Sequence, residues 1–265
     1  MEPEQIEIPL RGGRLARVVR IGNTVHRSVG PWTPAVHALL RHLEAKGFDA
    51  APQLRGFDAQ GREVLSFIPG ATATRPWPVE LRRDSGLRQF VTLLRRYHEA
   101  VQDFVPPDGA FWAAGSTPLK SGDIIRHGDF GPWNTIWLRG QPVGLIDFDL
   151  AEPGQPILDL AQAALFGVPL QGAQGIRLAG FSCRPNLHRR FLLLCRTYGK
   201  FGPSAVLAAV NSLVTSEIRR VETLGRAGRE PWATLLKNGK AKEFRKYKSS
   251  VPSRVRLLRI LYRLA

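Results

Sequence analysis

The sequence predicts an α+β fold, with a small antiparallel β-sheet and one helix at the N-terminus and a larger, mainly helical part behind them. Three observations lead to it: β-branched runs joined by a turn signal near the N-terminus, apolar residues at helical spacing through the second half, and a break between the two. Ile68-Pro69-Gly70 forms this break and is the predicted hinge. We therefore expect an N-terminal lobe over 1–68 and a C-terminal lobe over 69–265.

The N-terminal lobe is expected to begin with a β-hairpin. Residues 17–21 and 24–29 are rich in β-branched side chains, and the Gly-Asn pair at 22–23 favours a tight turn between them. Because side chains alternate along a strand, Arg27 is expected on the same face as Val25.

One helix and two more strands complete the predicted lobe. Thr33 is expected to cap the helix, with Pro34 as its first residue, and Gly47 to close it. Two further strands are expected at 53–57 and 63–67. The buried stripe of the helix is expected to contain Val36, Leu39, Leu40 and Leu43.

The C-terminal lobe is predicted to be mostly helical. Residues 71–84 contain two prolines and little periodicity, so we expect a loop there. A long amphipathic helix is expected at about 86–104, a hairpin over 135–146 and a further helix from near Pro156. The rest is expected to form helices broken at 199–203, 225–228, Gly239 and Pro252.

Composition is typical of a soluble globular protein, because 43% of the residues are hydrophobic and 23% are charged. There is no apolar run near the length of a membrane span, and the N-terminus is acidic and polar, unlike a signal peptide. The chain is therefore expected to be cytoplasmic. Its two cysteines, Cys183 and Cys195, form no disulfide framework and are expected to be buried thiols.

The basic character of the chain is concentrated at its C-terminal end. The net charge is +16, and residues 237–265 contain ten Lys or Arg and one acidic residue, Glu243, which gives this tail a charge of +9. Two interpretations stay open. The tail either contacts an anionic partner, such as nucleic acid, acidic peptide, membrane phosphate or the nucleotide, or it is a solvated helical surface.

A cluster of chemically active residues follows the predicted long helix. His127-Gly128-Asp129 is followed by Asn134 in an H-x-D-x-x-x-x-N pattern, and Asp147 comes shortly afterwards behind an apolar residue. One carboxylate can accept the proton of an attacking hydroxyl, while an amide oxygen and a second carboxylate hold Mg²⁺ against nucleotide phosphates. The spacing predicts a kinase active site that uses a nucleotide and Mg²⁺.

With Asp159-Leu160-Ala161, these motifs resemble the aminoglycoside phosphotransferase family, relatives of choline and homoserine kinases. The specific resemblance lies between 98 and 161, while the last hundred residues match only in general helical character. It implies a two-lobed protein-kinase-like fold that clamps ATP between the lobes. It also implies that Asp129 is the catalytic base, that Asn134 and Asp147 are the metal ligands, and that Asp159 supports the catalytic loop.

Other polar residues near the motifs have more than one interpretation. His127 is a candidate catalytic residue by position, although packing that shapes the loop is the favoured role. His98 lies on an apolar helical stripe and is expected to be a core histidine under the catalytic loop. Asp149 and Glu152 extend an acidic surface, help to hold a second ion, or lie in solvent.

The expected nucleotide-binding residues depart from the kinase pattern. A kinase usually presents a strand Lys to the phosphates, paired with a helix Glu, whereas this strand offers Arg27 and no Lys. Its helix partner is open between His37 and Glu44, and a glycine-rich loop is reduced to two residues. The predicted nucleotide-binding set is Arg27, Gly12, Gly13, Phe67 and Ile68.

The leading hypothesis is an ATP- and Mg²⁺-dependent phosphotransferase that acts on a hydroxyl of a small molecule or peptide. Because the C-terminal part is basic, we expect a neutral, anionic or peptidic acceptor rather than a polyamine sugar. The unusual Arg27 motivates an alternative, a kinase-like nucleotide- or peptide-binding or immunity module without turnover. Nucleic-acid binding through 237–263 is a weaker hypothesis, because few aromatic residues interrupt the basic ones.

Overall fold

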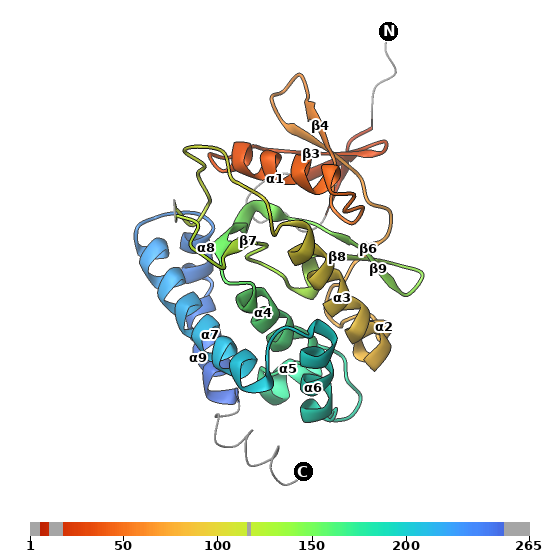
Figure 1. The fold of residues 1–265 in the computed structure, drawn as a ribbon, viewed down its shortest axis with the longest axis vertical. Helices are drawn as coiled ribbons and strands as arrows, with labels where there is room; N and C mark the ends of the chain where they lie inside the picture. The colour runs from red at the N-terminus through yellow and green to blue at the C-terminus, as the bar shows by residue number, and fades with distance from the viewer. Residues whose placement is uncertain (1–5, 11–17, 116–117, 252–265) are drawn as a thin grey trace.

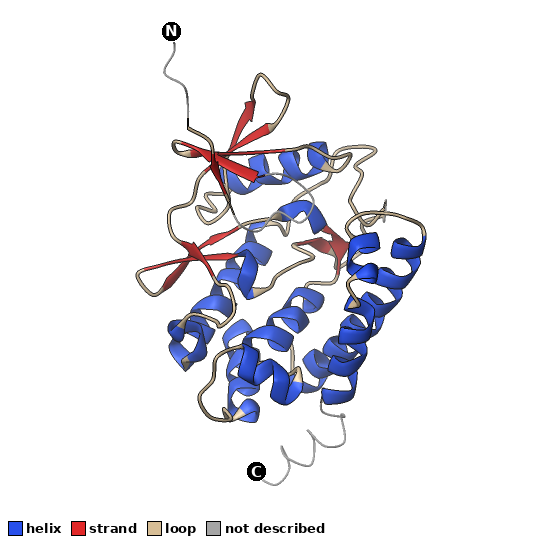
Figure 2. Ribbon diagram, turned by 180° about the vertical axis from the view of Figure 1, so that it is seen from behind, coloured by secondary structure: helices blue, strands red, loops and turns tan. Residues whose placement is uncertain are grey.

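All of the strands in the described residues precede the last six helices of the chain. The computed structural model describes residues 6–10, 18–115 and 118–251. The N-terminal strands and α1 lie together at one end of the molecule, and the C-terminal helices lie at the other (Figures 1 and 2). The predicted α+β class is confirmed.

The N-terminal sheet is antiparallel and has the strand order β1-β2-β3-β5-β4. Its strands are β1 (Ile8–Pro9), β2 (Val18–Ile21), β3 (Thr24–Arg27), β4 (Leu54–Phe57) and β5 (Glu63–Ser66). The predicted hairpin is β2–β3, and its turn uses Gly22 at a φ of +56°, a conformation that glycine adopts without steric cost. The predicted strands are confirmed, with slightly shorter bounds.

Helix α1 (Thr33–Ala45) buries the predicted stripe, because Val36, Leu39, Leu40 and Leu43 are all at most 1% exposed. The predicted cap is wrong. Trp32 occupies the N-cap position, and its carbonyl accepts the first helical hydrogen bond, from Val36 N. The hydroxyl of Thr33 instead accepts a hydrogen bond from Gly30 N at 2.9 Å, so it closes the turn before the helix.

After the last strand of the N-terminal sheet, the chain enters a second, three-stranded sheet. Strand β6 (Ala71–Thr72) pairs with β8 (Thr135–Leu138), which pairs with β9 (Gln141–Leu145). The loop predicted for 71–84 is therefore wrong, since it contains β6 and the one-turn helix α2 (Val79–Arg82). The partner of β6 is distant in sequence, so no local pattern signals it. The lobe boundary at 68/69 stays a prediction, and this change of sheet is the observation that bears on it.

Helices form most of the remaining chain. The predicted long helix is α3, which ends at Ala100 and not near 104, and the apolar pattern continues beyond it because Val101 and Phe104 are buried outside the helix. The predicted C-terminal breaks at 199–203, 225–228 and Gly239 are confirmed, and the one predicted at Pro252 lies outside the described residues. The helices are α3 (Asp84–Ala100), α4 (Ile157–Gly167), α5 (Gly172–Leu178), α6 (Leu187–Tyr198), α7 (Pro203–Arg226), α8 (Trp232–Lys237) and α9 (Lys240–Ser250).

Helix α4 runs through the core and packs against α3 and α7. Its residues from Asp159 onward are buried, so the helix carries polar side chains into the interior. Cys195 on α6 is buried, and burial raises the pKa of its thiol to about 12. Cys183 is exposed in the turn between α5 and α6, so the prediction of a buried thiol is wrong there. Among the helices described, we find none with the length and apolar character that crossing a membrane requires.

Candidate active site

The His127–Asn134 motif and the segment that carries Asp147 meet at one end of the β8–β9 hairpin. The catalytic loop follows β7 (Ile124–Arg126) and ends in the short 3₁₀ helix η1 (Pro132–Asn134), immediately before β8. The hairpin register places Thr135 opposite Leu145, and Ile146 N donates a hydrogen bond to the carbonyl of Asn134 at 2.9 Å. Asp147 is the next residue, so local hairpin pairing brings it beside Asn134.

Asp129 is half-buried, and three uncharged donors hold its carboxylate. Gln162 Nε2 donates to Oδ1 at 2.8 Å, while Trp133 Nε1 and Asn134 Nδ2 each donate to Oδ2 at 3.0 Å. Burial raises the pKa of Asp129 to about 7, with repulsion from Asp147 adding to the effect and the three hydrogen bonds opposing it. A fixed carboxylate that titrates near neutrality suits a general base.

The oxygen atoms of Asn134 and Asp147 fit a divalent cation. The amide nitrogen of Asn134 donates to Asp129, to both its carbonyl oxygen at 2.9 Å and its carboxylate, which leaves the amide oxygen of Asn134 for another partner. Asp147 has a left-handed backbone with a φ of +66°, and 44% of its side-chain surface is exposed. The surrounding protein still removes enough solvent, with repulsion from Asp149, to raise the pKa of Asp147 to about 6.

A bound cation would reduce the repulsion between these crowded carboxylates and would lower their raised pKa values. No group of three or more His, Cys, Asp or Glu side chains in the described ranges is arranged to hold a metal. Mg²⁺ does not require such a group, because it commonly takes one or two protein oxygens and completes its shell with phosphates and water. The donor set of one amide and one carboxylate therefore fits Mg²⁺ bound with a nucleotide.

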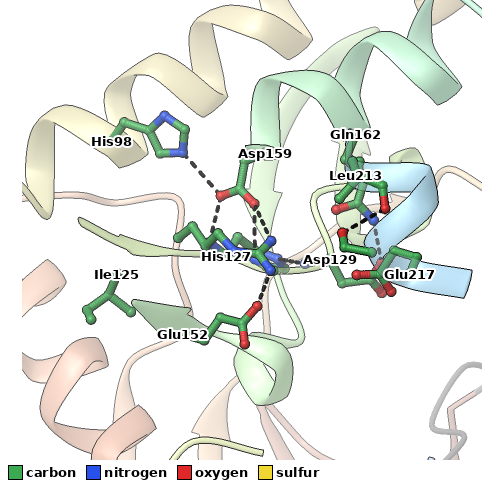
Figure 3. A network of polar contacts seen from close by, with 12 residues as sticks. His98, Ile125, His127, Asp129, Glu152, Asp159, Gln162, Leu213 and Glu217 are labelled. Atoms are coloured by element: carbon green, nitrogen blue, oxygen red, sulfur yellow. Dashed lines mark hydrogen bonds and ion pairs between the residues drawn. The ribbon is translucent and has the colours of Figure 1, made fainter. Parts of the chain in front are cut away.

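Asp159 anchors the catalytic loop through its carboxylate (Figure 3). Its carboxylate accepts hydrogen bonds from His127 N at 2.7 Å and Gly128 N at 3.1 Å, and His98 Nε2 lies 3.1 Å away. Burial opposes ionisation, but hydrogen bonding to His98 and nearby positive charge lower the pKa of Asp159 to about 2. The predicted supporting contact is present, and His98 is buried beneath the loop as predicted.

His127 is fully buried, and its contacts indicate a positioning role. Its ring lies 4.8 Å from the ring of Phe148, its Nε2 donates to the carbonyl of Ile146 at 3.0 Å, and its Nδ1 accepts from Asp129 N at 3.3 Å. Burial lowers the pKa of His127 to about 4, so the ring is neutral near pH 7. These contacts join the Asp129 segment to the Asp147 segment.

Gly128 allows the same two segments to approach closely. Its φ is +79°, and a Cβ atom at this position would lie 1.8 Å from the carbonyl oxygen of Leu150. Leu150 ends the 3₁₀ helix η2 (Phe148–Leu150), directly after Asp147. Only glycine fits this contact without displacing backbone.

Arg27 lies within a group of three carboxylates. Its Nε is 2.6 Å from Glu63, its Nη2 donates to Asp149 at 2.8 Å, and its Nη1 is 3.6 Å from Asp147. Burial acts to lower the pKa of Arg27, but attraction to these carboxylates outweighs it and raises the pKa. The guanidinium therefore links the N-terminal sheet to the segment that carries the candidate metal ligand.

The acidic partner of Arg27 comes from a strand and not from α1. Glu63 lies opposite Arg27 in the β3–β5 register, and His37 Nε2 from α1 contacts its second oxygen at 2.7 Å. Of the two candidate partners, Glu44 is exposed, and His37 acts on Arg27 only through Glu63. Glu63 was not predicted from the sequence, because its role depends on strand register.

Four other residues were predicted to bind the nucleotide. Gly12 and Gly13 lie outside the described residues. Phe67 lies under the guanidinium of Arg20 at 3.8 Å, and Ile68 packs close to Gly144 of β9. Neither contact tests their prediction as nucleotide-binding residues.

Asp149 and Glu152 are both paired with arginine. The interpretation that their side chains lie in solvent is therefore wrong for each. Asp149 contacts Arg27, and Glu152 is 6% exposed between Arg126 and Arg220. Glu152 begins β10 (Glu152–Gly154), which pairs with β7, and therefore braces the start of the catalytic loop (Figure 3).

Gln162 is the second site residue that was not predicted from the sequence. It follows Asp159 by three positions on α4, and this spacing places both side chains on one helical face. That periodicity is a signal in the sequence, but it gains meaning only when the face is known to point at Asp129.

Comparison with known proteins supports the predicted resemblance. Residues 110–193, which include every motif residue from His127 to Asp159, match the model of the phosphotransferase enzyme family. The trifolitoxin immunity protein of Rhizobium leguminosarum bv. trifolii is 43% identical over 169 residues, which are 62% of this chain and 63% of that protein. The aligned part thus spans less than two thirds of this curated relative.

Solved structures share the fold at low sequence identity. The GDP complex of wild-type aminoglycoside 2'-phosphotransferase-IIIa matches with a TM-score of 0.60 and 13% identity, over 94% of each chain. An ethanolamine kinase of Plasmodium vivax matches with a TM-score of 0.56 and 10% identity, over 93% of this chain and 81% of that one. The family match over 110–193 and this shared architecture relate the chain to the phosphotransferase enzyme family, with a protein-kinase-like fold.

Proposed function

We propose that this chain is an ATP- and Mg²⁺-dependent phosphotransferase that transfers the γ-phosphate to a hydroxyl of a small molecule or peptide. The observation that carries the proposal is the environment of Asp129. Three neutral donors fix its carboxylate, its pKa is raised to about 7, and Asn134 and Asp147 lie beside it.

In this proposal Asp129 acts on the acceptor. Its carboxylate orients the acceptor hydroxyl, whose oxygen forms a bond to the γ-phosphorus as the bond to the β-phosphate oxygen breaks. The hydroxyl proton passes to Asp129 and then to solvent. Mg²⁺ bound with the nucleotide, held by Asn134 and Asp147, would neutralise phosphate charge. Positioning and charge neutralisation supply most of the catalysis in such reactions.

Arg27 is proposed to bring positive charge to the nucleotide side of the site. The distance from Arg27 Nη1 to Asp147 is 3.6 Å, which is longer than the distances from Arg27 Nε to Glu63 and from Arg27 Nη2 to Asp149. A guanidinium can contact two oxygens of a phosphate at once, whereas an ammonium acts as a single point charge. Its fixed partners would hold Arg27 in place before the nucleotide arrives.

The acceptor is proposed to be neutral, anionic or peptidic. Helix α7 packs against α4 and α9, so its acidic side chains are the candidates for recognising a polycation. The acidic side chains paired with a basic one on α7 and α9 are Glu217 with Arg220, Glu222 with Arg245, and Glu243 with Lys240. Carboxylates already neutralised in this way offer little attraction to an aminoglycoside.

Transfer of labelled γ-phosphate tests the proposal directly. The purified chain is incubated with labelled ATP, and in parallel with labelled GTP, against a panel of alcohols and Ser- or Thr-containing peptides. We expect labelled product that requires Mg²⁺, is abolished by EDTA and is lost in Asp129→Asn. Transfer that persists in Asp129→Asn would remove the basis of the proposal.

A second candidate is a kinase-like immunity module that acts by binding without turnover. The observation that favours it is the 43% identity to a protein named as the trifolitoxin immunity protein. Asp129→Asn separates the two candidates, because it removes the proposed base and keeps the size of the side chain. Trifolitoxin-sensitive cells that express the wild-type chain or this variant are compared for growth with the toxin. Equal protection by a folded Asp129→Asn favours binding, and selective loss of protection favours turnover.

A further inference from the structure

Gln162 contacts the candidate base from the core side. The residue is 9% exposed on α4, and its Nε2 donates to Asp129 Oδ1 at 2.8 Å. The other half of its amide, Oε1, is buried and has no hydrogen-bond partner. Figure 3 shows Gln162 and Asp129 together, and α7 packs against α4, the helix that carries Gln162.

An unpartnered buried acceptor atom costs free energy and is uncommon in native proteins. Here the atom belongs to the same amide that holds the reactive carboxylate, so a group that reaches Oε1 also lies next to Asp129. The cost of leaving Oε1 unpaired is removed when a donor arrives with a ligand. The reacting hydroxyl does not supply that donor, because its single proton is directed to Asp129.

We propose that Gln162 is a specificity-determining residue, whose Nε2 holds Asp129 while Oε1 accepts a hydrogen bond from a second N–H or O–H group of the acceptor. This inference rests on the proposed phosphotransferase function and narrows its substrate class. The acceptor carries a donor beside the hydroxyl that is phosphorylated, as in a neutral 1,2-diol. A site with an acceptor atom awaiting a donor discriminates against analogues that lack that donor.

The pair 1,2-propanediol and 1-propanol tests this, because the two alcohols differ by one hydroxyl. In kinetic assays with ATP and Mg²⁺, we expect wild-type kcat/KM to be about tenfold higher for the diol, as one hydrogen bond would give. Gln162→Met keeps the length of the side chain and removes both polar atoms. This variant should lower kcat for both alcohols, because Asp129 loses a donor. It should also reduce the diol preference, which is the ratio of kcat/KM for 1,2-propanediol to kcat/KM for 1-propanol, to about one.

Gln171→Met is the matched control. Gln171 is also a buried glutamine with an unpartnered side-chain atom, its Nε2, but it precedes α5 and is not among the donors to Asp129. This variant should retain the wild-type diol preference. An unchanged preference in Gln162→Met would overturn the inference.

A binding measurement keeps the inference separate from the proposed activity. The side-chain amide signal of Gln162 is identified in ¹⁵N-labelled wild-type protein by its absence from Gln162→Met. With Mg²⁺ and a non-hydrolysable ATP analogue present, 1,2-propanediol should shift this signal and 1-propanol should not. A shift without phosphoryl transfer would support the contact and refute the function. No shift with the diol, or equal shifts with both alcohols, would refute the contact.

Discussion

The guanidinium of Arg27 is paired with Glu63, with 2.6 Å between Nε and Oε1, across two neighbouring antiparallel strands. The helix α1 contributes an imidazole, His37, to the second oxygen of Glu63, where a kinase usually contributes the carboxylate itself. The three nitrogens of one guanidinium each lie within 3.6 Å of a different carboxylate, on β5 and in the Asp147–Asp149 segment. This arrangement depends on the fork shape of arginine and not on charge alone.

Arg27→Lys is expected to be a poor replacement. The ammonium keeps the charge but does not reach Glu63 and Asp149 together, so we expect about tenfold weaker nucleotide binding and a loss of about 1–2 kcal/mol in unfolding free energy. Arg27→Met leaves buried carboxylates unpaired and should cost about 3–5 kcal/mol. Calorimetric nucleotide titration and urea unfolding measure the two effects.

Arg20→Lys on β2 is the control, because Arg20 lies over the ring of Phe67 near the surface and pairs with none of these carboxylates. It should stay within about 0.5 kcal/mol of wild type. If Arg27→Lys behaves like Arg20→Lys, the fork geometry is unimportant.

The sequence predicted those parts of the site that local pairing builds. Asp129, Asn134 and Asp147 lie on one loop and one hairpin, so their spacing along the chain fixes their spacing in the fold. Glu63 was missed because it meets Arg27 only through the register of two strands separated by α1. Strand β6 and residue Gln162 were missed for the same reason, since each acquires its role from a partner far along the chain.

Asp129→Asn is expected to abolish phosphotransfer and to stabilise the fold at alkaline pH. The pKa of Asp129 is about 7 in the folded chain against an ordinary 3.8, so ionisation is disfavoured by folding. The resulting destabilisation is absent below pH 3.8, grows as the pH rises, and is complete above pH 7. Removing the charge should therefore raise unfolding free energy by about 2–4 kcal/mol at pH 8 and by little near pH 4.

Urea unfolding of both proteins in EDTA at pH 4, 6 and 8 measures this difference, since EDTA removes cations that would stabilise the charged form. Gln162→Met serves as a comparison, because it removes a donor to Asp129 and leaves the charge. A stability difference that does not grow between pH 4 and pH 8 would contradict the buried-charge explanation.

His127→Gln should show the opposite pH dependence. The pKa of His127 is about 4 in the folded chain against 6.5 ordinarily, so the unfolded state takes up its proton first. Wild type then loses stability as the pH falls from 6.5 to 4, by up to about 3 kcal/mol, and the glutamine variant has no such loss. The variant should be less stable above pH 6.5, because packing on Phe148 is lost, and the gap should narrow towards pH 4. A gap that stays constant over this range would show that the ring does not titrate as proposed.

Gly128→Ala tests how closely the two motif segments must approach. The new Cβ would lie 1.8 Å from the backbone oxygen of Leu150, which has no flexible side chain to yield. We expect a loss of at least about 3 kcal/mol in unfolding free energy and no detectable phosphotransfer, because Asp129 moves away from Asp147. Gly61→Ala separates this clash from backbone strain, since Gly61 has a similar φ of +72° with nothing within 4 Å of its Cβ position. That variant should cost only about 1 kcal/mol and remain active. Equal losses in the two variants would mean that φ, and not contact with Leu150, selects glycine at position 128.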